Sequence, residues 1–198
     1  MCIPNKARSA LGALFVASSA LALGAGAARA AAEPPPAVEV TQASGSSGLV
    51  EAQLDIAAPP QTVWRVLVDC PNAPKLMVNL KSCRIIDHDP AGHWDVREQI
   101  SRASFLPSVR TVIRADYDPY HTVRFHKVDG DLKQLDGEWR LEPIDGGAHT
   151  HLTYESRVTA SFIAPGPIVR AILRHDMPLT LANLRKACEQ QAALAQQP

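Results

Sequence analysis

The chain has 198 residues, and its 20 basic and 20 acidic residues give a formal net charge of zero at pH 7. It contains no long basic run and no cluster of basic and aromatic residues, so nucleic acid is not an expected partner. The length allows one domain with a single hydrophobic core once a leader segment is set aside.

Residues 1–30 have the pattern of a secretory signal peptide. Lys6 and Arg8 make the start positive, residues 11–25 form an uncharged Ala/Leu-rich run, and residues 28–32 offer small residues for cleavage. The alternative is an uncleaved membrane anchor, but the run is Ala-rich and short for a spanning helix. The sequence therefore predicts an exported protein, either periplasmic or secreted.

The region after the leader has the composition of a flexible linker, which we expect over residues 31–47. Its prolines at 34–36 and its Ser/Gly cluster at 44–47 leave little to bury. The folded domain is expected over residues 48–190, followed by a tail over residues 191–198.

Three cysteines remain after cleavage, at Cys70, Cys83 and Cys188. An oxidising compartment favours a disulfide. A bridge between Cys70 and Cys83 would close a short loop and stabilise the fold by roughly 3 kcal/mol. Cys188 would then be a spare thiol on the last helix, although the sequence leaves other pairings open. A zinc site is disfavoured because no CxxC motif or close Cys/His pair accompanies these residues.

The first predicted elements are a strand and a helix. Residues 49–56 alternate between apolar and polar, as a half-buried strand does. Residues 59–60 are prolines that end the strand and open a helix, where proline is tolerated in the first turn. Residues 63–68 have helical spacing, and Pro71 and Pro74 end the helix.

From residue 81 onward the hydrophobic period falls to two. Strands of this period separated by turn residues form an antiparallel meander. The strands are expected around residues 83–89, 94–100, 109–117, 123–125, 135–141 and 152–158.

Residues 168–184 return to helical spacing and predict a long amphipathic helix, with a kink expected near Pro178. An antiparallel sheet with one apolar face must have that face covered. This helix is the element long enough to cover it. The sequence therefore predicts an α+β protein in which a curved antiparallel sheet of about seven strands surrounds a long C-terminal helix.

This order of elements resembles the START-like, or SRPBCC, superfamily of polyketide cyclase/dehydrase and lipid-transport domains. The stretches that carry the resemblance are VEAQLDIAAPPQTVWRVLVDCPNAPKLMVNLKSCRII, LDGEWRLEP and THLTYESRV. They look most like the branch of coenzyme-Q-binding proteins and ribosome-association toxins. The resemblance implies a helix-grip fold with a ligand cavity between the sheet and the last helix.

The resemblance leaves the function open, because this fold hosts carriers, enzymes and protein-binding modules. The predicted export argues against a role at the ribosome or in the respiratory chain. In that branch an aromatic-rich stretch follows the start of the first helix, whereas here Cys70, Pro71 and Pro74 stand in its place.

The residues expected to line the cavity come from the inward register of the strands and of the last helix. They are Trp94, Val96, Glu98, Ile100, Thr111, Ile113, Tyr117, Phe125, Leu135, Trp139, Tyr154, Ser156, Leu173 and Met177. At least half of the inward residues are expected to be ordinary core.

Three features of the sequence favour a cavity over a solid core. Gly137 contributes no side chain at an inward position, and Glu98, Thr111 and Ser156 share the apolar register. A curved sheet over one helix also leaves room. An empty, dry cavity of about 500 Å³ would cost about 12 kcal/mol, so the cavity must be small, hydrated or occupied.

Among the polar residues on this register, Glu98 matters most for the site because its side chain is a carboxylate. A buried carboxylate must pair, lose its charge by protonation, or face water or ligand. Glu98 or Tyr154 could orient the polar head of an apolar ligand. The alternative is that Glu98 pairs with a neighbouring arginine such as Arg110 and has only a structural role.

The chain contains no nucleophile elbow, phosphate loop, EF-hand or HExxH motif, so we assign no catalytic residue, metal or cofactor. His149 and His151 share one face of a strand, but that face is expected to be solvated. The leading hypothesis is an exported, non-catalytic carrier of a hydrophobic small molecule or lipid, a role compatible with transient membrane contact. The alternatives are a cyclase/dehydratase-type enzyme using Glu98 or a His/Tyr pair, and a protein-interaction module with no identified partner.

Overall fold

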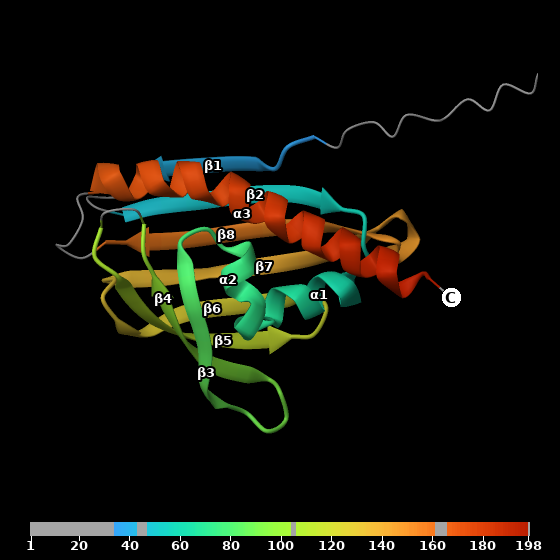
Figure 1. Ribbon diagram of the computed structural model, residues 1–198, viewed down its shortest axis with the longest axis horizontal. Coiled ribbons are helices and arrows are strands. Elements are labelled where there is room, and N and C mark those ends of the chain that lie inside the picture. Colours follow the sequence, from blue (N-terminus) through green and yellow to red (C-terminus); the bar gives the residue numbers. More distant parts are fainter. Residues whose placement is uncertain (1–33, 43–46, 104–105, 161–165, 198) are drawn as a thin grey trace, which may run out of the picture. The chain divides into compact units, whose positions relative to one another are not determined.

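The computed structural model describes residues 34–42, 47–103, 106–160 and 166–197, so the predicted signal peptide lies outside the described residues. Within these residues, eight strands form one antiparallel sheet in the order β1-β2-β8-β7-β6-β5-β4-β3 (Figure 1). The strands are β1 (Ala37–Gln42), β2 (Ser47–Ile56), β3 (Leu80–His88), β4 (Trp94–Ser101), β5 (Val109–Asp118), β6 (Thr122–Gly130), β7 (Gln134–Ile144) and β8 (His149–Thr159).

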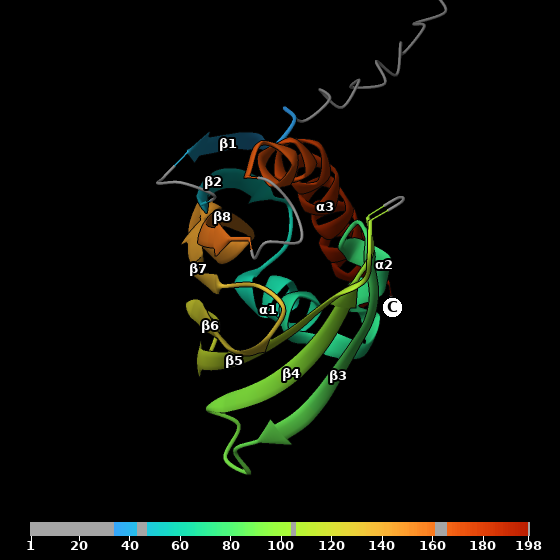
Figure 2. The ribbon, with the colours of Figure 1, turned by 90° about the vertical axis from the view of Figure 1, so that its left-hand side faces the viewer.

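The helices cover the inner side of the sheet. They are α1 (Pro60–Val68), α2 (Ala73–Leu76) and α3 (Gly166–Ala195), with short 3₁₀ helices η1 (Cys70–Asn72) and η2 (Asp145–Gly147). Figure 2 shows the sheet curving from β1 round to β3, with all three helices on its concave side. The predicted α+β helix-grip fold is confirmed.

Strand β1 corrects the expected linker. Its residues pair with β2, and Val40, opposite Val50, is buried. The proline and Ser/Gly clusters on either side suggested a flexible segment, but the alternation of Val38 and Val40 gives this stretch one apolar face. That face packs against the core, which adds a strand to the expected sheet.

The solid core lies where α1 and the C-terminal half of α3 meet β2, β7 and β8. The side chains that are fully buried there include Ile56, Val63, Leu141, Leu152 and Leu181. These are the apolar positions of the predicted helical and strand patterns. They hold α3 against the sheet at this end.

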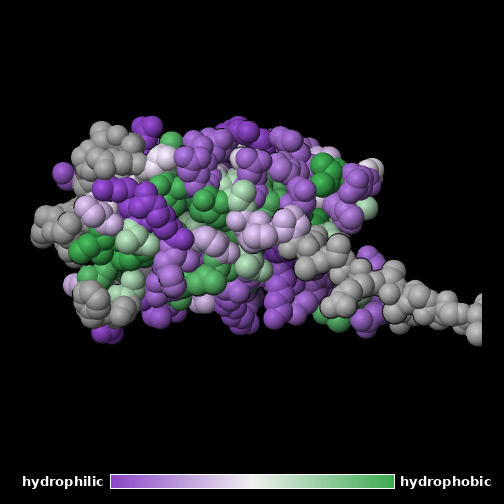
Figure 3. Space-filling view, turned by 90° about the horizontal axis from the view of Figure 1, so that it is seen from above, coloured by the Kyte–Doolittle hydropathy of each residue, from purple (hydrophilic) through white to green (hydrophobic). Residues whose placement is uncertain are grey.

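Helix α3 has two halves that differ in burial. On the C-terminal side of Pro178, Leu181 and Leu184 are buried, whereas Leu173 and Met177 on the N-terminal side are half-buried. The helix runs on through Ala195 and so includes most of the expected tail. The face seen from above in Figure 3, where α3 and β1 lie, is largely hydrophilic with smaller hydrophobic patches.

The predicted disulfide is confirmed, since Cys70 of η1 is bonded to Cys83 of β3. Cys188 is a buried free thiol among the described residues. No helix in the described ranges is both long and apolar enough to span a bilayer.

Candidate ligand cavity

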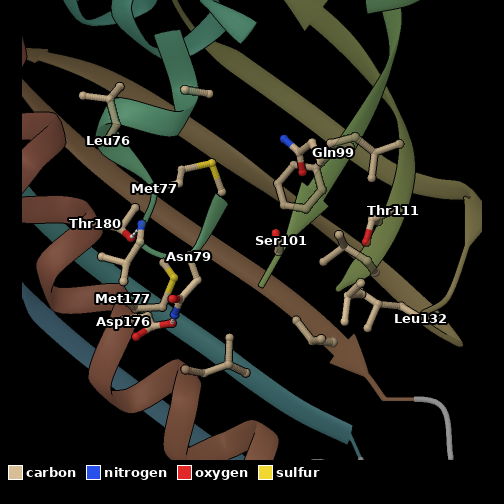
Figure 4. A pocket seen from close by; sticks show the side chains of 18 of the residues that line it. Leu76, Met77, Asn79, Gln99, Ser101, Thr111, Leu132, Asp176, Met177 and Thr180 are labelled. Atoms are coloured by element: carbon tan, nitrogen blue, oxygen red, sulfur yellow. Dashed lines mark hydrogen bonds between the residues drawn. The ribbon is translucent and has the colours of Figure 1, made fainter. Parts of the chain in front are cut away.

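A cavity of about 360 Å³ lies between the inner face of the sheet and the N-terminal half of α3. Its walls come from β4 to β8, from α3, and from the α1–α2 region and the segment after it. The volume lies at the lower end of the range for small-molecule sites, about 300–1,000 Å³. The interior is therefore not solid, and Figure 4 shows part of the cavity wall.

The residues predicted to line the cavity divide into two groups. Those that line it are Thr111, Ile113, Phe125, Leu135, Trp139, Tyr154, Leu173 and Met177. Those that do not are Trp94, Val96, Glu98, Ile100, Tyr117 and Ser156.

The prediction for β4 was wrong by one register. The inward residues of β4 are the polar ones, and Asp95 and Arg97 are only 6% and 7% exposed. Arg97, Gln99 and Ser101 line the cavity. A one-residue shift moves a whole strand's side chains to the other face of the sheet.

The other residues of β4, which include Trp94 and Glu98, lie on the outer face of the sheet. The guanidinium of Arg114 lies 4.3 Å from the ring centre of Trp94. Glu98 accepts hydrogen bonds from Arg110 at 2.7 Å and from Arg84 at 3.0 Å. These bonds hold the pKa of Glu98 below its usual range. Glu98 therefore pairs with Arg110, as the alternative prediction for this residue stated.

A polar cluster of Asp95, Arg97 and Tyr117 lies on the inner side of β4 and β5, and its Arg97 lines the cavity. Arg97 donates from Nε to Asp95 Oδ1 at 2.8 Å and from Nη2 to Asp95 Oδ2 at 2.6 Å. The hydroxyl of Tyr117 donates to Asp95 Oδ2 at 2.5 Å and also contacts Arg97. A buried ion pair must satisfy its hydrogen bonds to offset desolvation, and this bidentate pair does so.

The pKa values within this cluster follow from its burial and its pairing. Burial alone would lower the pKa of Arg97, but the bonds to Asp95 and the nearby charges raise it above its ordinary value. For Tyr117, whose charged form is the phenolate, burial raises the pKa. Tyr117 was predicted to face the cavity, but it packs edge-on against Trp64 with ring centres 5.7 Å apart.

The opposite wall is aromatic. The ring of Tyr154 lies 4.1 Å from that of Trp139 and stacks on Phe125 at 6.2 Å, measured between ring centres. Burial raises the pKa of Tyr154 to about 12, so its phenol is neutral at ordinary pH. Ser156, two residues along β8, is buried but does not line the cavity.

Gly137 does not leave the space that we inferred from its missing side chain. A Cβ placed on Gly137 would lie 2.8 Å from Cζ of Phe125 and 2.2 Å from the carbonyl oxygen of Glu155. The Phe125 ring therefore occupies the room above the glycine. Gly137 permits this close approach and adds nothing to the cavity volume.

Two hydrogen bonds join α3 to the segment that leads into β3. Asn79 donates from Nδ2 to Asp176 Oδ2 at 2.6 Å, and the backbone N–H of Val78 donates to Thr180 Oγ1 at 3.2 Å (Figure 4). All four residues line the cavity. Asn79 holds a left-handed φ of 67°, a conformation that asparagine tolerates.

The histidines considered as metal ligands lie apart from the cavity. His149 pairs with Asp145 at 2.7 Å and His151 with Asp55 at 2.6 Å. The described ranges contain no group of three or more His, Cys, Asp or Glu side chains arranged to hold a metal ion.

Comparisons with known proteins agree with this architecture. The family described as polyketide cyclase/dehydrase and lipid transport matches residues 56–185. A search of curated proteins found no match.

Several solved structures share the fold. A STAR-related lipid transfer protein from Xanthomonas axonopodis superposes with a TM-score of 0.63 at 14% identity, covering 77% of this chain and 99% of that one. The Zhui aromatase/cyclase from a Streptomyces species gives a TM-score of 0.59 at 17% identity, covering 74% and 94%. A START superfamily protein from Mycobacterium smegmatis gives 0.59 at 19%, covering 74% and 98%. At such identities the likeness shows the fold alone.

Proposed function

The chain belongs to the polyketide cyclase/dehydrase and lipid transport family, and we propose that it binds and carries a hydrophobic small molecule without transforming it. The observation that carries the proposal is the cavity of about 360 Å³ with a mainly apolar wall between sheet and helix. Such a space surrounded by a few polar groups is typical of a small-molecule site.

The energetics of the cavity support an occupant. At the coefficient measured for core truncations, an enclosed dry void of this size would cost on the order of 9 kcal/mol, and the partial opening of this cavity to solvent lowers that cost. Water is a poor filling for apolar walls, because a buried water needs two to four polar partners. An apolar ligand would relieve this cost.

Two titratable groups of the cavity wall, Tyr154 and Arg97, favour binding over catalysis. A general acid or base works best with a pKa near the operating pH. Tyr154 has a pKa of about 12, and the guanidinium of Arg97 is held by Asp95. The enzyme alternative named Glu98 or a His/Tyr pair, and the Glu98 carboxylate lies outside the cavity in ion pairs with Arg84 and Arg110.

We place this carrier outside the cytoplasm. The leader pattern of residues 1–30 predicts export. The disulfide between Cys70 and Cys83 fits the same proposal, because disulfides persist in oxidising compartments.

Uptake of an uncharged hydrophobic dye such as Nile red tests the proposal. Ser101 and Ile100 are neighbours on β4, and Ser101 lines the cavity whereas Ile100 does not. Ser101→Trp should place an indole in the cavity and reduce dye binding about tenfold or more, since the remaining volume would fall below the usual range for small-molecule sites, about 300–1,000 Å³. Ile100→Trp, the matched control on the other face, should bind dye as the wild type does.

Two results would count against the carrier. One is a wild-type protein that takes up no dye at all. The other is equal dye binding by folded Ser101→Trp and Ile100→Trp, which would place the dye somewhere other than this cavity.

A further inference from the structure

We infer that the cavity selects uncharged ligands that carry a hydrogen-bond-accepting oxygen, such as long-chain ketones, esters or alcohols, and discriminates against carboxylates. The inference rests on the proposed function and narrows its ligand class. It follows from the arrangement of charges around the cavity, in which Asp95 neutralises Arg97.

The charged groups among the described lining residues include one cation, and that cation is paired. Among the described residues that line the cavity, Arg97 is positive, and Asp131 and Asp176 are negative. The side chains of Arg97 and Asp95 are each 8% exposed and are joined by two hydrogen bonds, so together they carry no net charge.

A carboxylate entering this space would lose water without gaining a partner. Removing an isolated charge from water is costly unless it is paired and hydrogen-bonded. The cation that could pair with it already has a carboxylate in bidentate contact, and Asp131 and Asp176 add repulsion. An uncharged oxygen escapes both penalties.

Neutral donors for such an oxygen lie along one wall. Gln99, Ser101 and Thr111 line the cavity from β4 and β5 (Figure 4). Their side chains take part in none of the hydrogen bonds found within the described part of the chain. Each can donate to a carbonyl or hydroxyl oxygen. The facing wall of Phe125 and Trp139 suits the apolar body of the same ligand.

Competition between two matched ligands tests the inference. Nile red bound to the wild type is displaced with a long-chain methyl ketone or with the fatty acid of equal chain length, at about pH 8, where the free acid is ionised. We expect the ketone to displace the dye at a concentration at least about tenfold lower than the acid. An acid that competes as well as the ketone, or better, would overturn the inference.

A substitution at Asp95 tests the cause. Asp95→Asn should leave the charge of Arg97 unopposed and improve displacement by the acid, relative to the ketone, by about tenfold or more. Asp116→Asn is the matched control, because Asp116 pairs with Arg114 at 2.9 Å and does not line the cavity. Its ketone preference should equal that of the wild type.

Two further results separate the possible failures. A folded Asp95→Asn variant with an unchanged ketone-to-acid ratio overturns the role of Asp95. If that variant does not fold, Asp95→Asn/Arg97→Gln removes both charges and should keep the ketone preference, and losing it would overturn the inference. A wild type that binds neither the dye nor either ligand overturns the carrier proposal and this inference with it.

Discussion

At the scale of single residues, the pair of Gly137 on β7 and Phe125 on β6 determines how the aromatic wall of the cavity packs. The two residues lie opposite each other in the sheet. The Phe125 ring lies over the glycine and stacks on Tyr154. A side chain at Gly137 would meet both this ring and the backbone of β8. The position therefore requires glycine because of close packing, since its φ does not lie in the left-handed region.

Gly137→Ala is expected to destabilise the protein by about 1–3 kcal/mol, because the added methyl group overpacks a tight site. Gly48→Ala is the control, since a Cβ there would make ordinary contacts of 3.5 Å or more. Its effect on the unfolding free energy should be small. Chemical denaturation of both variants measures the difference, and equal stabilities would show that Phe125 moves aside without cost.

Single residues also show where sequence reasoning succeeds and where it fails. Ile113 and Leu135 were placed on the cavity wall correctly, because apolar side chains in alternation mark the inner face of a strand. Arg97 was missed because a charged residue is expected outside unless paired. Its pairing with Asp95 and Tyr117 depends on two different strands. The unbroken polar alternation of Asp95, Arg97, Gln99 and Ser101 was the signal that could have found it.

At the scale of elements, the disulfide ties η1 to β3, the strand at one edge of the described sheet. Outer strands of a sheet have one paired neighbour and lose order more readily than central ones. The cross-link joins positions 13 apart in the sequence. It fixes the α1–β3 connection, including the part that lines the cavity.

Replacing Cys70 and Cys83 by alanine should lower the unfolding free energy by about 3 kcal/mol, because the denatured chain regains the freedom that the closed loop removes. A reducing agent should have a similar effect on the wild type and none on the double variant. Equilibrium unfolding with and without the reductant checks both expectations. Equal stability of the wild type and the double variant would contradict the stabilising role of the cross-link.

The helices and most strands were predictable because their hydrophobic periods differ. Strand β1 was not, since six residues between a proline run and a Ser/Gly cluster give a weak pattern. Its order depends on pairing with β2 and on packing against the core. Such contacts between distant segments override local composition.

At the scale of the whole molecule, the order of strands and helices predicted the fold. It also predicted that a cavity exists, but not the volume of that cavity or all of its lining residues. The cavity volume depends on how far the sheet curves and on side chains from β4 to β8, α1 and α3. Neither quantity can be read from periodicity. The sequence could therefore predict a cavity, whereas the charge balance of its wall required the structure.

Native mass spectrometry of the protein, purified without detergent, tests the claim that the cavity holds an apolar, uncharged molecule. We expect a mass above that of the bare chain, with the difference released on denaturation as an uncharged, oxygen-bearing compound. The additional mass should persist in the Ile100→Trp variant and disappear in the Ser101→Trp variant. A wild-type protein that shows only the mass of the bare chain, and stays so after incubation with long-chain ketones and lipids, would contradict it.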